Sequence, residues 1–296
     1  MSSPYPTRPS PAGQAGAPFP SWNGVTPPTV EPRPPRRRSR LWLHIVLFLL
    51  TVASTWHAQD YLYSISLLTI LTAHEFGHYF AARYYRVKAT LPYFIPSPFM
   101  LGTLGAVIRM SPYIPNRRAL FDIAAAGPIA GLVVALPVTV VGLMFSLHVP
   151  SGVDVESPFT YGTPLLFQAL EQVILGAPQQ NQTLVMNTVA LAGWVGLFVT
   201  ALNLLPISQL DGGHISYAVF GRKSRLIAVA TFVTLATVTV LQGFHYSLIL
   251  VLLWFMGIGH PPTLNDDVDL GRPRRIVGAL LLVVFILCFT PVPIEM

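Results

Sequence analysis

The motif "HEFGH", His74–His78, places two imidazoles and a carboxylate in a segment that is otherwise apolar. On a helix, residues four apart lie on the same face, about one turn from each other. His74 and His78 can therefore bind one Zn²⁺ ion together, and Glu75 lies where it can accept a proton from an activated water. At membrane depth an ionisable side chain costs about 2–3 kcal/mol or more, which favours a functional role over simple helix packing.

A catalytic zinc site needs a third protein ligand, and Asp211 is the best candidate. Asp211 lies in "NLLPISQLDGGH", Asn203–His214, where Pro206 interrupts an apolar run. By itself, an aspartate in a "DGG" sequence is more typical of a solvated turn. Asp211 is therefore either a zinc ligand or a solvated turn residue. The two can be distinguished by whether Asp211 lies on the same side of the membrane as the histidines.

The composition indicates a membrane protein. Of the 296 residues, 10% are charged and 52% are apolar, and the mean hydropathy is +0.57. Soluble domains have about 25% charged residues. The net charge of +6 does not indicate nucleic-acid binding, because the basic residues cluster at the ends of apolar runs. Cys288 is the single cysteine, so an intrachain disulfide is excluded.

Apolar runs follow one another from Leu41 onward, several of them near the length of about 17–25 residues that crosses a bilayer. The run Tyr246–Gly259 is short, so the sequence predicts an all-α multi-pass membrane protein with six or seven transmembrane helices. The predicted spans are Leu41–Trp56, Tyr61–Ala82, Ala119–Leu147, Met186–Leu205, Leu226–Gly243, Tyr246–Gly259 and Ile276–Val292.

Residues 1–40 have a different composition and form a separate region. They are rich in proline and arginine and contain one acidic residue, Glu31. Such a segment cannot bury enough apolar surface to fold, so we expect a disordered cytoplasmic tail. An organellar transit peptide is the alternative, but so much proline argues against its amphipathic helix. Residues 41–296 are expected to form one membrane-embedded domain.

The basic residues orient the predicted spans. Lys and Arg favour the cytoplasmic side, so the arginines before Leu41 place the N-terminus in the cytoplasm. No Lys or Arg occurs between Arg118 and Arg222, a stretch that contains the predicted external loop His148–Val185. That loop is shorter than the roughly 50 residues of a small domain. With this threading, the HEFGH run and the run before Asp211 both descend toward the cytoplasm, so Asp211 reaches the depth of the histidines.

The segment Ala89–Pro115 fits no helix, because five prolines interrupt it. Between them, Leu101–Met110 is apolar and contains Gly102 and Gly105, which favours a strand or a hairpin. Irregular backbone at membrane depth is tolerated where it packs on protein or lines a water-filled cavity. We therefore expect a re-entrant or interfacial β-hairpin near residues 89–115, beside the zinc site.

Three other polar residues have local interpretations. Asp122 follows Arg118 by four residues, which predicts an ion pair along one helix. His214 either supports the metal site from outside the ligand shell or packs at a helix start. His260 lies near the end of an apolar run, which predicts an interfacial position.

Three motifs occur in the order found in the site-2 protease family of intramembrane zinc metalloproteases. They are "HEFGH", "AAAGPIAGL" (Ala124–Leu132) and "NLLPISQLDGG", and the resemblance covers about Tyr61–Phe220. "GTLGAVIRM" and "PNRRALFDIAAAGP" resemble most the branch that includes plastid homologues and has no PDZ domain. The resemblance implies one zinc ion per chain held by His74, His78 and Asp211, with Glu75 as the catalytic base. It also implies a substrate contact at Asn203 and a catalytic core at about residues 61–221.

The resemblance also implies partners and a location. Its substrates would be single-span membrane proteins, cut in or near their transmembrane segments within the lipid bilayer. The location would be a cell inner membrane with the N-terminus in the cytoplasm, an organellar membrane being the alternative. Two rival functions are a membrane zinc hydrolase of a non-peptide substrate and a transporter. A transporter predicts two halves with matching broken helices, which this sequence does not have.

Overall fold

The computed structural model describes residues 41–150, 160–177, 182–207, 209–242 and 246–295. The predicted tail, residues 1–40, lies outside these ranges, and its disorder stays a prediction. Everything described below belongs to one compact unit, Arg40–Met296.

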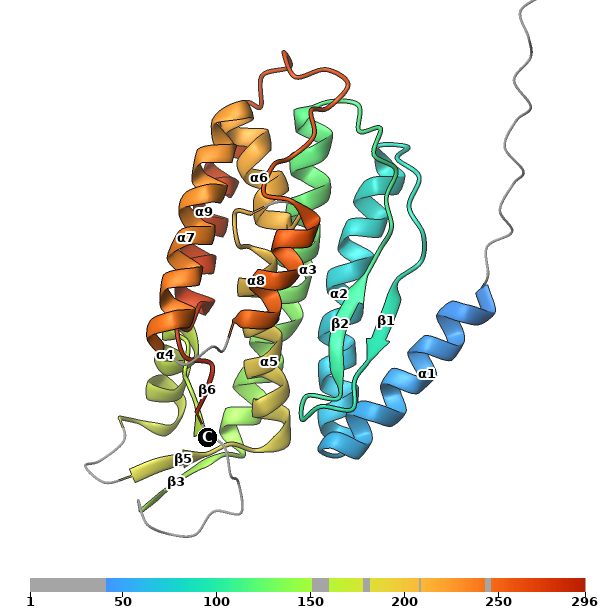
Figure 1. Ribbon diagram of the computed structural model, residues 1–296. Coiled ribbons are helices and arrows are strands. Elements are labelled where there is room, and N and C mark those ends of the chain that lie inside the picture. Colours follow the sequence, from blue (N-terminus) through green and yellow to red (C-terminus); the bar gives the residue numbers. More distant parts are fainter. Residues whose placement is uncertain (1–40, 151–159, 178–181, 208, 243–245, 296) are drawn as a thin grey trace, which may run out of the picture. The chain divides into compact units, whose positions relative to one another are not determined.

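Helices make up most of the described chain, as the sequence predicts (Figure 1). A 3₁₀ turn at Gly221–Lys223 joins α6 to α7. The helices are α1 (Leu41–Ala58), α2 (Tyr61–Tyr84), α3 (Arg117–Met144), α4 (Leu165–Leu175), α5 (Thr188–Asn203), α6 (Asp211–Phe220), α7 (Ser224–Gln242), α8 (Ser247–Met256) and α9 (Arg272–Cys288).

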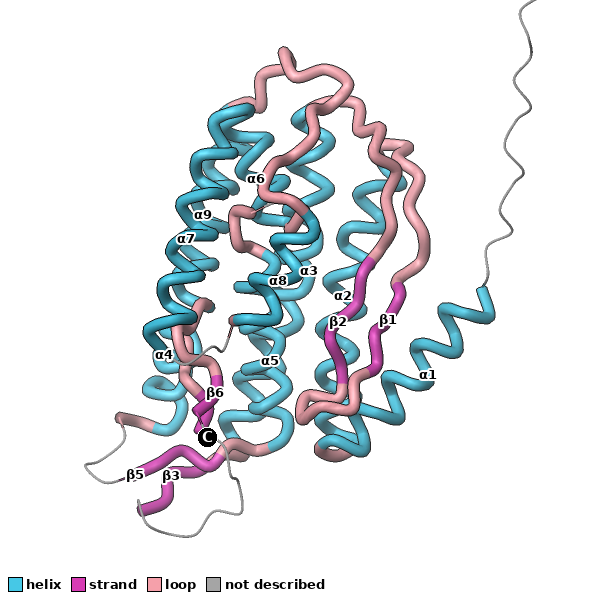
Figure 2. Tube along the Cα trace, viewed as in Figure 1, coloured by secondary structure: helices cyan, strands magenta, loops and turns pink. Residues whose placement is uncertain are grey.

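Short strands pair into small antiparallel two-stranded sheets (Figure 2). The pair β1–β2 is the hairpin predicted near residues 89–115. The pairs β3–β5 and β4–β6 have no counterpart in the sequence prediction of an all-α protein with one hairpin. The strands are β1 (Tyr93–Pro96), β2 (Thr103–Val107), β3 (Leu147–Pro150), β4 (Thr160–Tyr161), β5 (Gln182–Val185) and β6 (Ile294–Glu295).

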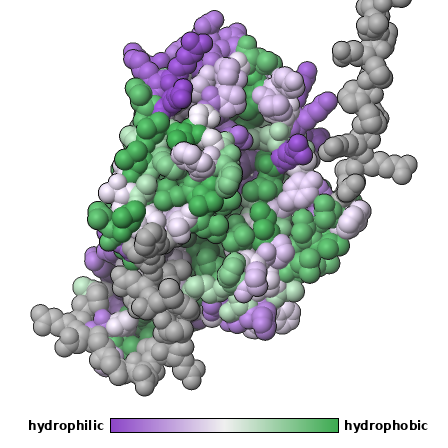
Figure 3. Space-filling model, in the orientation of Figure 1, coloured by the Kyte–Doolittle hydropathy of each residue, from purple (hydrophilic) through white to green (hydrophobic). Residues whose placement is uncertain are grey.

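Three helical segments within the described residues are long and apolar enough to cross a membrane: Leu41–Ala58, Arg117–Met144 and Asp211–Gln242. The last combines α6, the 3₁₀ turn and α7. Helices α4, α5 and α8 are apolar but shorter. Apolar side chains cover the middle of the face in Figure 3, and polar ones gather at the end that carries the α8–α9 connection. This distribution suits a protein whose middle contacts lipid.

Polar caps fix where the central helices begin. The side chain of Asp60 accepts a hydrogen bond from the Tyr63 amide at the start of α2 (2.7 Å). Asn116 caps α3 in the same way, through the Ala119 amide (3.0 Å). Such caps satisfy amides that have no partner within the helix. The caps therefore set the register in which α2 and α3 present their inner faces.

The β1–β2 hairpin is anchored on α1 and α2. Ser54 donates a hydrogen bond to the Gly102 carbonyl in the hairpin turn (2.6 Å), and the Tyr63 hydroxyl donates to the Leu101 carbonyl (3.1 Å). Gly102 has a φ of +71°, and an added Cβ would lie 2.5 Å from the Thr55 Cα. Only glycine suits this turn, because the backbone is left-handed and lies directly against α1.

The predicted external loop contains a helix that was not among the predicted elements. Helix α4 spans Leu165–Leu175, and its Phe167 is fully buried in the main apolar core with Trp194 of α5 and Tyr63 of α2. The signal was present as apolar residues at helical spacing, "LLFQALEQVIL". The described part of this loop therefore lies folded over one end of the helices, where β3 and β5 also pair.

The predicted ion pair between Arg118 and Asp122 is wrong. Asp122 instead binds the guanidinium of Arg274 through two hydrogen bonds (2.8 and 2.7 Å) and accepts one from the Tyr85 hydroxyl. Arg118 donates to the carbonyl oxygen of Asp269 (2.6 Å). A planar guanidinium that binds both carboxylate oxygens is a stronger arrangement than an exposed pair along one helix. Asp122 thus joins α3 to α2 and α9.

Candidate metal centre and active-site cavity

Three side chains from two helices converge on one point. The Nε2 atoms of His74 and His78 lie 3.3 and 3.2 Å from Oδ2 of Asp211, and 3.2 Å from each other. The helical spacing brings the two α2 histidines together, whereas Asp211 arrives from the first turn of α6. Within the described part of the chain, this is the one cluster of three such side chains close enough to hold a metal ion.

The nature of the three donors fits zinc. Two imidazole nitrogens and one carboxylate oxygen are ligands that zinc takes in catalytic sites, with a fourth position left for water or substrate. The side chains are largely shielded from solvent, since His74 is 4% and His78 5% exposed. Buried groups of this kind need a partner, which a shared cation supplies.

The other ring nitrogen of His78 is also held. Its Nδ1 lies 2.7 Å from the carbonyl oxygen of Ile123 on α3. A carbonyl only accepts hydrogen bonds, so Nδ1 carries the proton and the Nε2 lone pair points to the metal position. Helix α3 therefore supplies no ligand, but it fixes the ring that does.

Glycines on α3 make room for the two imidazoles. An added Cβ at Gly127 would lie 2.0 Å from His78 Nε2, and one at Gly131 would lie 3.1 Å from His74 Nδ1. At Gly77 of α2, an added Cβ would lie 2.4 Å from the carbonyl oxygen of Ala126. Small residues thus let the two helices approach closely, as in tightly packed membrane helices. This gives "AAAGPIAGL" a structural role: it is the surface against which the ligands lie.

Asp211 is the first residue of α6 and not part of a free turn. Its carboxylate lies at the positive end of the helix dipole, which favours the charged form. The preceding chain folds back tightly, because an added Cβ at Gly212 would lie 2.0 Å from the Leu204 carbonyl oxygen. The turn interpretation of "DGG" therefore fails: the glycines allow the start of a helix against the end of α5.

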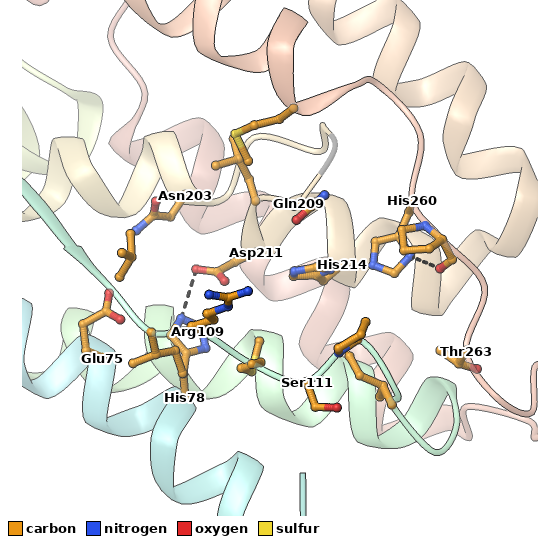
Figure 4. A pocket seen from close by; sticks show the side chains of 18 of the residues that line it. Glu75, His78, Arg109, Ser111, Asn203, Gln209, Asp211, His214, His260 and Thr263 are labelled. Atoms are coloured by element: carbon orange, nitrogen blue, oxygen red, sulfur yellow. Dashed lines mark hydrogen bonds and ion pairs between the residues drawn. The ribbon is translucent and has the colours of Figure 1, made fainter. Parts of the chain in front are cut away.

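A cavity of about 490 Å³ lies beside the three ligands (Figure 4). Glu75, 5% exposed, lines it next to the ligands but is not one of them. The backbone of Ile108, just after β2, interacts with the Glu75 carboxyl group. The other lining residues come from β2 and the chain after it, from α5, from the start of α6, and from the end of α8 and the chain that follows it. The cavity is lined by His74, Glu75, His78, residues 106–112, Ile114, Asn203, residues 209–211, His214, Met256 and residues 260–263.

Asn203, the predicted substrate contact, lies at the last position of α5 and reaches the metal centre. Its side-chain nitrogen lies 3.2 Å from His74 Nε2. The structure thus brings all five predicted site residues to one cavity: Glu75 and Asn203 beside the three candidate ligands.

Two histidines contact each other across the cavity wall. Nδ1 of His214 on α6 lies 2.5 Å from Nε2 of His260, which also stacks on Tyr217 with ring centroids 4.5 Å apart. The Tyr217 hydroxyl donates to Asp266 (2.6 Å). The chain Gly257–Gly271 is therefore held against α6 close to Asp211. The interfacial position predicted for His260 did not include this contact, since no local pattern links His260 to His214.

Comparisons with known proteins agree with this geometry. The family described as "Peptidase family M50" matches residues 62–242. The chain is 35% identical over 233 residues to "Probable zinc metalloprotease EGY1, chloroplastic" of Oryza sativa subsp. japonica, covering 77% of this chain and 39% of that one. The protein of the same description from Arabidopsis thaliana is 33% identical over 236 residues, covering 76% and 42%. The match thus spans about two fifths of the length of these relatives.

The first prediction concerns the metal. Purified full-length protein is expected to hold about one zinc ion per chain. His74→Ala removes one of the three ligands, so zinc retained after dialysis should fall to roughly a tenth or less. Elemental analysis by mass spectrometry measures this. His57→Ala, at an exposed histidine at the end of α1, is the control and should keep the metal. Full zinc retention in His74→Ala would disprove the ligand assignment.

The second prediction tests the glycine surface of α3. Gly127→Ala should raise intrinsic helix propensity by about 1 kcal/mol, yet its Cβ would collide with the His78 ring. We therefore expect zinc affinity to fall by about tenfold or more, measured by competition with a chelator. Gly259→Ala is the matched control, because an added Cβ there has no atom within 4 Å. Equal affinities in the two variants would contradict the packing argument.

Proposed function

The chain belongs to peptidase family M50, the site-2 protease family, and on that premise we propose that it is an intramembrane zinc metalloprotease. It would hydrolyse peptide bonds in or near the transmembrane segments of single-span membrane proteins. The observation that carries this proposal is the convergence of His74, His78 and Asp211 beside Glu75. These polar groups lie among long apolar helices, where they cost free energy unless they have a function.

The catalytic roles follow from the geometry of the cavity. His74, His78 and Asp211 would hold the zinc ion, which supplies Lewis-acid activation of water and of the scissile carbonyl. Glu75 does not ligate, so its carboxylate is free to take the proton of the attacking water and deliver it to the leaving amine nitrogen. The Asn203 amide, 3.2 Å from His74 Nε2, is placed to donate a hydrogen bond to the substrate carbonyl oxygen.

We further propose that the substrate binds as an extended strand along β2. A helical substrate must unwind, because its peptide bonds are hidden in its own hydrogen bonds. In the described residues β2 pairs only with β1. Beyond β2, the same edge of the strand stays hydrogen-bonded: the Thr90 amide donates to the Arg109 carbonyl, and the Ser111 amide donates to the Lys88 carbonyl. Backbone groups alternate in direction along a strand, so those of Ile108 and Met110 face the cavity. An unwound substrate can pair with this edge.

We extend the proposal to the arrangement in the membrane. Six or seven segments would cross it: the three long ones, α2, α5, α9 and, for seven, the short α8. The β1–β2 hairpin would enter from the cytoplasmic side. The N-terminus and the Arg222–Arg225 turn would lie in the cytoplasm, and the α4 region outside. The membrane would be a cell inner membrane; the relatives described as chloroplastic make an organellar membrane the alternative.

The third prediction separates an enzyme from a zinc-stabilised scaffold. Glu75→Gln keeps the size of the side chain but cannot accept a proton. Cleavage of a single-span model substrate should fall by about 10²-fold or more, while zinc content and thermal stability stay at the wild-type level. Glu171→Gln is the control, since Glu171 is also buried but lies on α4 and lines no part of the cavity. Near wild-type cleavage by Glu75→Gln would remove the case for this mechanism.

The fourth prediction tests the topology. Lys223→Cys and Ala177→Cys place thiols at exposed positions on the two proposed sides. In a Cys288→Ala background, a membrane-impermeant maleimide added outside intact cells should label Ala177→Cys and leave Lys223→Cys unlabelled until the membrane is opened. If both positions react from outside, the threading is wrong.

A further inference from the structure

Arg109 is a charged residue of the cavity that the mechanism does not use. It lies just after β2 and lines the cavity together with His74, His78 and Asp211. Figure 4 shows its side chain pointing into the cavity. In the sequence, no motif marks Arg109, which is one of the basic residues that precede the apolar run Ala119–Leu147.

The backbone of Arg109 is fixed, which leaves the side chain as its free part. Its amide donates to Thr90 Oγ1 (3.0 Å), and its carbonyl accepts from the Thr90 amide (3.0 Å). Both bonds lie on the side of the strand that faces β1, where the Ser111 amide also donates to the Lys88 carbonyl (2.8 Å). The hairpin therefore fixes the backbone from which the exposed Arg109 side chain extends into the cavity.

The guanidinium of Arg109 has no carboxylate partner among the described residues. The ion pairs that arginines form with carboxylates in this part of the chain involve Arg274 and Arg275. Of the two carboxylates of the cavity, Asp211 contacts the two histidines, and neither Asp211 nor Glu75 forms a described ion pair with Arg109. A cationic group that faces a cavity without a partner is suited to a ligand that brings its own negative charge.

The neighbours of Arg109 limit what that ligand can be. Val107, Ile108 and Met110 beside it are apolar, so the wall offers one charge within an apolar strip. This suits an apolar peptide with a single acidic side chain. Ile108 contacts the catalytic Glu75, and Arg109 follows it on the way to α3. Arg109 therefore lies one residue further along this strand than Ile108, toward α3.

From this placement, and resting on the proposed protease function, we propose that Arg109 determines substrate specificity. It binds an aspartate or glutamate side chain of the substrate, close to the scissile bond on its cytoplasmic side, and it repels lysine or arginine there. A guanidinium can bind both oxygens of a carboxylate, which a lysine cannot do with the same geometry. The apolar part of the cavity accepts the rest of the unwound segment.

The experiment uses full-length protein in phosphatidylcholine vesicles and a panel of single-span model substrates. Each substrate carries Asp, Asn or Lys at one position near the cleaved bond on the cytoplasmic side, and kcat/KM is measured for all three. At one of the tested positions, we expect kcat/KM for the Asp substrate to be about tenfold higher than for the Asn substrate. At that position, kcat/KM for the Lys substrate should be about tenfold lower than for the Asn substrate. The affinities of the same substrates for the Glu75→Gln protein, in which cleavage is slowed by about 10²-fold or more, should follow the same order.

Substitutions at Arg109 then test the cause. Arg109→Glu should invert the order, so that Lys becomes the preferred residue, while zinc content stays unchanged. Arg109→Lys should keep the preference for Asp in weaker form. Lys88→Glu is the matched control: it makes the same change of charge on an exposed residue of the same hairpin segment, but Lys88 does not line the cavity. The Lys88→Glu protein should rank the Asp, Asn and Lys substrates by kcat/KM in the same order as the wild type.

The outcomes separate this inference from the proposed function. If the wild type cleaves the Asp, Asn and Lys substrates with equal kcat/KM at every position, Arg109 does not set specificity, although the protease function stands. The same conclusion follows if Arg109→Glu keeps the wild-type order. If the wild type cleaves none of the panel and binds none of it as the Glu75→Gln protein, the proposed function and this inference are both wrong.

Discussion

The structure depends on one constraint: two imidazoles and a carboxylate must meet inside a bundle of apolar helices. Asp211 lies within 3.3 Å of both histidines, and each of these groups is unfavourable to bury alone. Mutual contact and a shared cation offset that cost. This contact fixes the position of α6 relative to α2, although the two helices are distant in sequence. The packing of the other helices must be compatible with that position.

Close helix packing is what allows it. The rings of His74 and His78 occupy the space left by Gly131 and Gly127, and the Ile123 carbonyl of α3 orients His78. A larger residue at Gly127 would displace the ligand and not simply loosen the core. Stability and metal binding are thus parts of the same packing problem, because the surface that holds α2 against α3 also holds the ligands.

The hairpin has two edges with different tasks. One edge of β2 pairs with β1, while the turn at Gly102 and the Ser54 hydroxyl tie the pair to α1. The other edge runs along the cavity past Glu75. A strand that is fixed on one side and, among the described residues, unpaired on the other supports the proposed pairing with an extended substrate. In the proposed mechanism, the anchoring of the hairpin on α1 therefore helps to position the substrate.

The sequence by itself determined the features that depend on neighbouring residues. The four-residue spacing in "HEFGH" puts both histidines on one helix face, and the prolines and glycines of Ala89–Pro115 exclude a helix and favour the hairpin. The basic residues even placed Asp211 on the side of the histidines. Only the tertiary structure decided which distant groups meet. In the folded chain, Asp122 pairs with Arg274 and not with Arg118. His214 contacts His260, and Arg109 lines the cavity. These contacts depend on how whole helices pack, and a pairing between residues far apart leaves no periodic pattern along the chain.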